Sequence, residues 1–301
     1  MLTALQLRAK RGSHEIAAMP GALVLQAVGL AALREAERAA ASMRAVQPSL
    51  MRVVIGDAAT LHRASDLFQL KIDVEDGLDA SVTQALRRAA NVETGCRRRV
   101  GCADAQVRAL RIARMAHLRR LVPRYAFVVA LDADSLACGP ALGDAFEPPD
   151  NAMWDVALRP VPVAVRKGPA RNMPPYPPEF SGALMVLRNT TKTRALLAEW
   201  AVLYARDQDG KHPTSDQPLL RAALRSTSTR VRYLPLGYGC AVWSAAAKEC
   251  PAFTADVRRA VGPAAQKVRR DKLGGPNAAL WRAHERALNR WACVMLHGLH
   301  G

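Results

Sequence analysis

The feature that most constrains the fold is an apolar run, Tyr125–Leu131, that ends abruptly in the acidic pair Asp132 and Asp134. Such a run is typical of a strand buried on both faces, as in a mostly parallel sheet covered by helices. Side chains at i and i+2 of an extended chain point to the same side, so the two carboxylates can converge where the strand leaves the sheet. Ligands of these sheets bind beyond the carboxyl ends of the strands, which suits a divalent cation carrying a phosphorylated ligand. The plainer interpretation is a polar strand exit with two solvated aspartates.

The chain before this run alternates strand and helix signals, which predicts a layered α/β fold. We expect residues 1–18 to be a disordered or loosely packed lead-in and residues 19–301 to form one domain. The expected strands are 21–26, 50–55, 183–187, 230–234 and 292–296. The expected helices are 30–46, 81–90, 104–122 (capped by Asp104), 277–291 and two that follow residues 193 and 215. The rest of 58–101 and the Pro- and Gly-rich segment 140–178 are expected to be loop, the latter a binding loop or lid, and 237–240 a turn.

Composition excludes some classes of protein. Half of the 301 residues are apolar, which argues against wholesale disorder. The six cysteines contain no C-x-x-C pair, which argues against zinc or thioredoxin-like chemistry, while short disulfides (96–102, 240–250) and free thiols both stay open. The stretch 17–33 is too short and too interrupted to span a bilayer, and no secretory signal is visible.

The charge balance is strongly basic, at 43 Lys plus Arg against 26 Asp plus Glu, or +17. This sign favours anionic partners such as nucleotides, nucleic acid or acidic membrane surfaces. Arginines are scattered, however, and Arg97–Arg99 is the only tight run, so a compositional bias explains them better than a basic patch. In the helix expected at 104–122, Arg111 and Arg114 fall within the apolar stripe. Either the guanidinium groups of these two arginines are paired with anions or water inside the protein, or their aliphatic stems pack while the guanidinium groups reach solvent.

Four features in sequence order resemble glycosyltransferases of the GT-A fold, the nucleotide-diphospho-sugar transferases. The nearest families are galactosyl- and xylosyltransferases and the plant and algal cell-wall arabinosyltransferase-type group. The features are Arg111 with Pro123 and Leu131-Asp132-Ala133-Asp134; Ser181-Gly182-Ala183 leading to Leu187-Arg188-Asn189; Asp216-Gln217 opening a helix; and His297-Gly298.

The resemblance implies a mixed, mostly parallel sheet sandwiched by helices and a metal-dependent transfer of sugar. The donor would be a nucleotide-diphosphate sugar and the acceptor a hydroxyl of a glycan or glycoprotein, with retention as the expected outcome. Manganese, or Mg²⁺, would be held by the metal ligands Asp132, Asp134 and His297. The remaining implied site residues are Arg111, Ala133, Ser181, Gly182 and Ala183 around the donor, and Asp216 and Gln217 in catalysis. The Golgi lumen is the compartment that the resemblance suggests, although no signal or anchor is visible in this chain.

Three alternatives remain open, of which one is a degenerate, non-catalytic transferase fold. The run 128–135 also resembles the D-x-D strand of haloacid-dehalogenase-like phosphatases, in which Asp132 would accept a phosphoryl group and Asp134 act as general acid. That motif normally opens its domain, whereas two βα units precede it here. A basic nucleic-acid-binding protein is suggested by the net charge alone, without a recognised motif or aromatic platform, so nucleic acid is not the expected partner.

Overall fold

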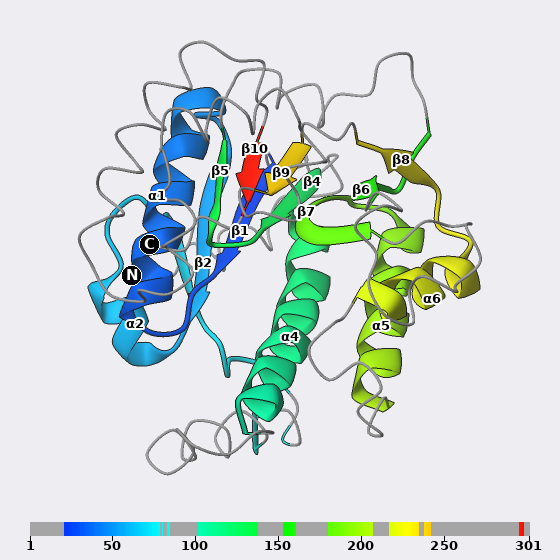
Figure 1. The fold of residues 1–301 in the computed structure, drawn as a ribbon, viewed down its shortest axis with the longest axis horizontal. Helices are drawn as coiled ribbons and strands as arrows, with labels where there is room; N and C mark the ends of the chain where they lie inside the picture. The colour runs from blue at the N-terminus through cyan, green and yellow to red at the C-terminus, as the bar shows by residue number, and fades with distance from the viewer. Residues whose placement is uncertain are drawn as a thin grey trace, which may run out of the picture.

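A seven-stranded sheet forms the centre of the computed structural model (Figure 1), in the order β3-β2-β1-β4-β7-β6-β8. Its strands are β1 (Ala22–Gln26), β2 (Met51–Gly56), β3 (Leu70–Asp73), β4 (Phe127–Leu131), β6 (Val156–Pro160), β7 (Phe180–Arg188) and β8 (Val231–Tyr233). The structure describes residues 21–78, 80, 83–84, 102–137, 153–160, 180–206, 217–234, 238–241 and 295–297. The side chains of 102–106, 136, 238–241 and 295–297 are not described.

Strand direction divides the sheet into two parts. The strands β3, β2, β1 and β4 are parallel, β7 runs antiparallel to both β4 and β6, and β8 is parallel to β6. The predicted mixed, mostly parallel sheet is therefore confirmed. A second, three-stranded sheet has the order β5-β10-β9, with β5 (Ser135–Ala137), β9 (Tyr238–Ala241) and β10 (Met295–His297).

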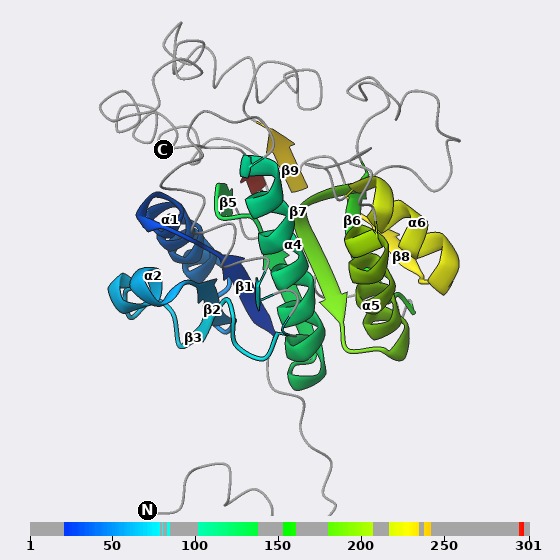
Figure 2. The same cartoon turned by 90° about the horizontal axis from the view of Figure 1, so that it is seen from below.

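Helices cover both faces of the large sheet, and successive residues of each strand serve opposite faces. Ala22 and Val24 of β1 pack in the core with α4 (Cys102–Leu121), α5 (Thr191–Arg206) and α6 (Gln217–Thr227). Leu23 and Leu25 pack in the other core with α1 (Leu30–Val46). Figure 2 shows α4 and α5 side by side along the sheet. Within the described chain, no helix has both the length and the apolar composition needed to span a bilayer.

The elements with long apolar patterns were predicted well. Helix α1 has the expected bounds, and β1, β2, β7 and β8 lie within about two or three residues of theirs. Helix α4 begins at Cys102, so the prediction that Asp104 caps it is wrong. The segment predicted as a turn at 237–240 instead belongs largely to β9.

Three short elements occur where loop was predicted: α2 (Ala58–Arg63), β3 and β6. Strand β3 is an edge strand of four residues with no buried position, so its apolar signal is weak. Strand β6 contains a buried Arg159 and ends in Pro160, which concealed it in a Pro-rich region. The lead-in 1–18, most of the helix expected at 81–90, segment 161–179, helix 277–291 and the cysteine side chains lie outside the described residues.

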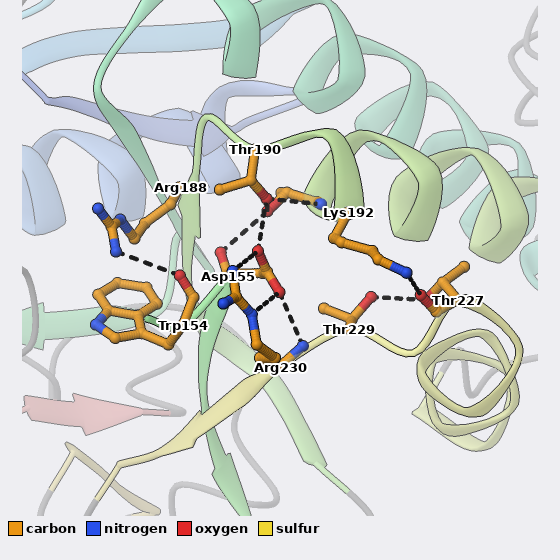
Figure 3. Close-up of polar contacts among 9 residues, drawn as sticks. Trp154, Asp155, Arg188, Thr190, Lys192, Thr227, Thr229 and Arg230 are labelled. Atoms are coloured by element: carbon orange, nitrogen blue, oxygen red, sulfur yellow. Dashed lines mark hydrogen bonds and ion pairs between the residues drawn. The ribbon is translucent and has the colours of Figure 1, made fainter. Parts of the chain in front are cut away.

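At the amino-terminal edge of β6, Asp155 joins three segments of the chain (Figure 3). This residue is 0% exposed, and its carboxylate accepts hydrogen bonds from Arg230 N, Nε and Nη2 at 2.9, 3.0 and 3.0 Å. Thr190 Oγ1 also donates to the carboxylate at 2.9 Å, and Thr193 Oγ1 donates to the Asp155 carbonyl at 3.0 Å. The carboxylate thereby fastens β6, the β7–α5 turn and the start of β8 together.

We expect Asp155→Ala to lower the free energy of unfolding by about 2–3 kcal/mol, because it leaves the half-buried Thr190 hydroxyl and the Arg230 N–H without their acceptor. Chemical denaturation measures this change. Asp76→Ala is the control, because Asp76 is 62% exposed and pairs with Arg120 at 3.8 Å. The control should cost less than about 1 kcal/mol. Equal costs for the two variants would contradict the structural role of Asp155.

Asp155 should also make the fold sensitive to acid. Burial alone would raise its pKa, but the hydrogen bonds from Arg230 and Thr190 outweigh burial and hold the pKa below its ordinary 3.8. A depressed folded-state pKa contributes stability above the unfolded-state value, and this is lost as pH falls through the folded-state value. The stability difference between wild type and Asp155→Asn, which cannot titrate there, should therefore shrink below about pH 4. A pH-independent difference would contradict this.

Candidate functional site

The acidic pair lies in the turn that follows β4, at the carboxyl edge of the sheet. The Asp132 N–H donates to the Ala183 carbonyl of β7 at 2.9 Å, and the Ser135 N–H donates back to the Asp132 carbonyl at 3.1 Å. Asp132 and Asp134 are both half-buried. The predicted position of the pair at the end of a strand is correct, but the two residues do not continue the extended strand. A tight turn, in which Ser135 N–H reaches back to Asp132, sets the relation between the two residues.

This turn lies where the strand order of the large sheet reverses. The chain leaves β1 and builds β2 and β3 on one side, then returns to place β4 on the other side of β1. Leu25 of β1 pairs with Leu131 of β4, so both strands end at the same level. In open α/β sheets the crevice beyond such a switch point is where ligands bind.

Helix α4 brings arginine to this edge. Gln26, the last residue of β1, donates through Nε2 to the Leu110 carbonyl of α4 at 2.9 Å. One turn further along α4, Arg114 Nη1 contacts Asp132 Oδ1 at 2.6 Å, with exposed side-chain fractions of 16% for Arg114 and 32% for Asp132. Arg114 Nη2 is buried and has no hydrogen-bond partner among the described residues. This ion pair thus leaves one donor of the guanidinium unused.

The sequence singled out Arg111 as the cationic site residue, whereas Arg114 is the one seen on Asp132. Arg111 lies three residues earlier in α4 and is half-buried. Residues three apart in a helix share a face, so both are near the same edge. The role of Arg111 stays a prediction. For Arg114, the interpretation that its head merely reaches solvent is wrong, because its head meets an aspartate.

The segment Ser181–Ala183 of β7 borders the acidic turn on its other side. Between β6 and β7 the pairing shifts from Leu158 opposite Met185 to Pro160 opposite Phe180. One residue of β6, Arg159, thus lies between these two pairs where β7 has four, residues 181–184. Irregular pairing of this kind is common beside binding sites. A Cβ placed on Gly182 would meet no described atom within 4 Å. Packing among the described residues therefore does not require glycine there, and none of these residues fills the space that a ligand would need.

The second sheet brings the end of the chain to the acidic turn. Strand β10 pairs antiparallel with β5, and His297 lies opposite Ser135, the residue after Asp134. His297 is the last residue of this strand instead of the residue that follows it. Among side chains that the structure describes, no group of three His, Cys, Asp or Glu could hold a metal ion, but the His297 side chain is not among them. Its role as a third ligand stays a prediction.

The acidic-Gln pair is described only in part. Gln217 is the first residue of α6 and is half-buried, while Asp216 lies outside the described residues. Pro218 follows at the start of the helix, as expected, because a missing N–H costs nothing there. Helix α6 packs against α5 and β7, the strand that carries Ser181–Ala183.

Comparisons with known proteins agree with this architecture. No family model and no curated protein matches the sequence. Among solved structures, the chain resembles galactosyltransferase LgtC in complex with donor and acceptor sugar analogues, with a TM-score of 0.51 and 13% identity, over 91% of this chain and 86% of that one. It also resembles mouse xyloside xylosyltransferase 1, with a TM-score of 0.52 and 14% identity, over 93% and 97%. At this identity the likeness shows the fold, which is the GT-A fold.

The Arg114 contact makes a prediction about metal binding. If the acidic turn binds a divalent cation, the guanidinium beside Asp132 opposes it, so Arg114→Gln should tighten binding of Mn²⁺ alone about fivefold to tenfold. Calorimetry with Mn²⁺ in the absence of nucleotide measures this. Arg111→Gln, one helical turn away, is the matched control and should change the affinity less. Weaker Mn²⁺ binding by Arg114→Gln would contradict the prediction.

Proposed function

We propose that this chain is a metal-dependent glycosyltransferase that moves a sugar from a nucleotide-diphosphate sugar to a hydroxyl of a glycan or glycoprotein, with retention of configuration. The observation that carries the proposal is the acidic turn after β4, which lies at the switch point of a GT-A fold beside the partly buried cation Arg114. The likeness to a galactosyltransferase and a xylosyltransferase supports the same reaction class.

The residues at the turn fit a divalent cation. Asp132 already attracts a positive charge, and it is exposed enough to offer an oxygen to a second one. Two carboxylates with an imidazole from His297 form a mixed oxygen and nitrogen set that suits Mn²⁺, or Mg²⁺. When bound, the metal supplies Lewis-acid stabilisation of the charge on the departing diphosphate. Asp132, Asp134 and His297 would hold it.

The arginines of α4 would bind the diphosphate. Arg114 offers its buried, unused Nη2, and Arg111 lies one turn further out on the same helix. Guanidinium groups match phosphate oxygens in geometry and stay charged at any working pH. Together with the metal they would hold the diphosphate in place and favour its departure. Ala133 lies within the same turn and would contact the donor through its backbone.

The sugar would lie on the β7 side of the turn. There Ser181, Gly182 and Ala183 would present backbone to the sugar or the acceptor, as the open space at Gly182 permits. Asp216 would hydrogen-bond sugar hydroxyls or stabilise positive charge at the anomeric carbon. Gln217 would orient the sugar or receive the transient charge, and its place at the start of α6, which packs on β7, is compatible with that role.

The bonding of the arginines weakens the nucleic-acid alternative. Among the described residues, several of them bind groups of the protein itself. Arg52 donates to the Leu67 and Leu50 carbonyls, Arg108 donates to the Tyr204 carbonyl, and Arg230 pairs with Asp155. That the net charge reflects a compositional bias stays a prediction. The phosphatase alternative would require a phosphoenzyme on Asp132.

We expect Asp132→Asn and Asp134→Asn each to lower Mn²⁺-dependent transfer or donor hydrolysis by at least about 100-fold, because amide oxygens bind the metal poorly. Release of nucleoside diphosphate from a panel of sugar nucleotides measures the rate. Circular dichroism should show an intact fold, and Asp76→Asn, at an exposed site, should retain activity. Full activity in either variant, or a phosphorylated Asp132 trapped from the wild type, would contradict the proposal.

A further inference from the structure

The segment Ala27–Gly29 leaves the carboxyl end of β1, the strand next to β4. Since Leu25 pairs with Leu131, this segment emerges beside the acidic turn at the switch point. A nucleotide-diphosphate sugar is linear, with its diphosphate between nucleoside and sugar. If the diphosphate lies at the turn and the sugar on the β7 side, then the nucleoside falls on the β1 side, over this segment.

Residues of the next βα unit hold the segment in place. The Gly29 N–H donates to Asp57 Oδ2 at 3.1 Å and to Thr60 Oγ1 at 2.8 Å, although Gly29 lies 28 and 31 positions away. The Ala27 N–H donates to the Ile55 carbonyl at 2.8 Å. The N–H groups of Ala27 and Gly29 thus point to the end of β2 and the start of α2.

The backbone of Gly29 depends on these contacts. Its φ of 85° lies in the region that other residues seldom adopt, while a Cβ there would meet no described atom within 4 Å. Glycine is therefore needed for the conformation and not for space. The N-terminus of α1 has no side-chain cap, and Asp57 and Thr60 accept from the N–H of its N-cap residue Gly29, the group that the third helical residue binds in a capping box.

The two acceptors are themselves fixed. Thr60 is 1% exposed, its Oγ1 donates to Asp57 Oδ2 at 2.7 Å, and its N–H donates to Asp57 Oδ1 at 2.9 Å. Burial alone would raise the pKa of Asp57, but the hydrogen bonds from Thr60 and Gly29 hold it below its ordinary value. The carboxylate is therefore ionised at neutral pH and keeps both oxygens engaged.

We propose that Asp57 and Thr60 are positioning residues that hold segment 27–29 in the conformation that receives the nucleoside of the donor. This inference rests on the proposed function. A segment fixed before binding loses less conformational entropy when a ligand orders it, so affinity is higher. Loss of the hydroxyl at Thr60 frees the segment without touching the acidic turn, and nucleotide affinity falls while the chemical step is unchanged.

The test measures binding of UDP, GDP, CDP and ADP by calorimetry in the presence of Mn²⁺, for wild type and three variants. Thr60→Val is isosteric and removes the acceptor, and we expect it to raise the dissociation constant of the tightest nucleotide about fivefold to tenfold. Thr60→Ser restores the hydroxyl and should bind within about twofold of wild type. In turnover, Thr60→Val should raise KM for the donor and leave kcat within about twofold.

The third variant, Thr193→Val, controls for stability. Thr193 is 0% exposed and its hydroxyl also makes a buried bond, to the Asp155 carbonyl at the opposite edge of the sheet. It should lower Tm as Thr60→Val does but leave the dissociation constant unchanged. Should Thr60→Val fail to fold, Asp57→Asn, at a partly exposed position, replaces it with the same expected loss of affinity.

The outcomes separate the two proposals. Nucleotide binding by wild type with an equal dissociation constant in Thr60→Val overturns the role of Asp57 and Thr60 and leaves the transferase proposal standing. A parallel loss of affinity in Thr193→Val shows a general loss of stability and overturns it as well. If wild type binds none of the four nucleotides, the proposed function fails and this inference fails with it.

Discussion

The register between β4 and the antiparallel strand β7 determines where the acidic turn lies. Leu131 pairs with Leu184, and the ladder continues into the bond from Asp132 N–H to the Ala183 carbonyl. Residues 128–131 of β4 are all fully buried, and a slip of one position would exchange its two faces. The packing of the core therefore fixes the position of the site.

The two edges of the sheet differ in how far their charged groups are paired. At the amino-terminal edge of β6 and β8, the buried Asp155 carboxylate joins three segments of the chain. Both of its oxygens accept hydrogen bonds from the protein. At the carboxyl edge of β4, charge is left partly unsatisfied, with a half-buried Asp132 and an unused donor on Arg114. Unused polar groups are costly in a core but useful at a site, where a ligand can satisfy them. The unused donor beside Asp132 therefore supports the proposed site at the carboxyl edge of β4.

Sequence reasoning succeeded where local signals are long and failed where contacts are distant. Helix α1 is predicted by its apolar periodicity and strand β4 by its continuous apolar run. The position of the acidic turn is predicted with β4, because the turn is the next segment of the chain. A helical wheel places both Arg111 and Arg114 on the apolar face without giving their height relative to β4. Arg111 was chosen on the family resemblance, and the contact of Arg114 with Asp132 was missed. Strand β6 escaped notice because Arg159 and Pro160 interrupt its pattern. The pairing of His297 with Ser135 depends on a long-range contact that no local pattern reveals.

The central claim is that the carboxyl edge binds a sugar nucleotide together with a divalent cation. Thermal unfolding of the wild-type chain with a panel of sugar nucleotides, in Mn²⁺ and in EDTA, tests it most directly. A ligand that binds the native state at 100 times its dissociation constant stabilises by about 2.7 kcal/mol. We expect at least one sugar nucleotide to raise Tm by several degrees in Mn²⁺ and to lose this effect in EDTA. No rise with any sugar nucleotide, or an equal rise in EDTA, would contradict it.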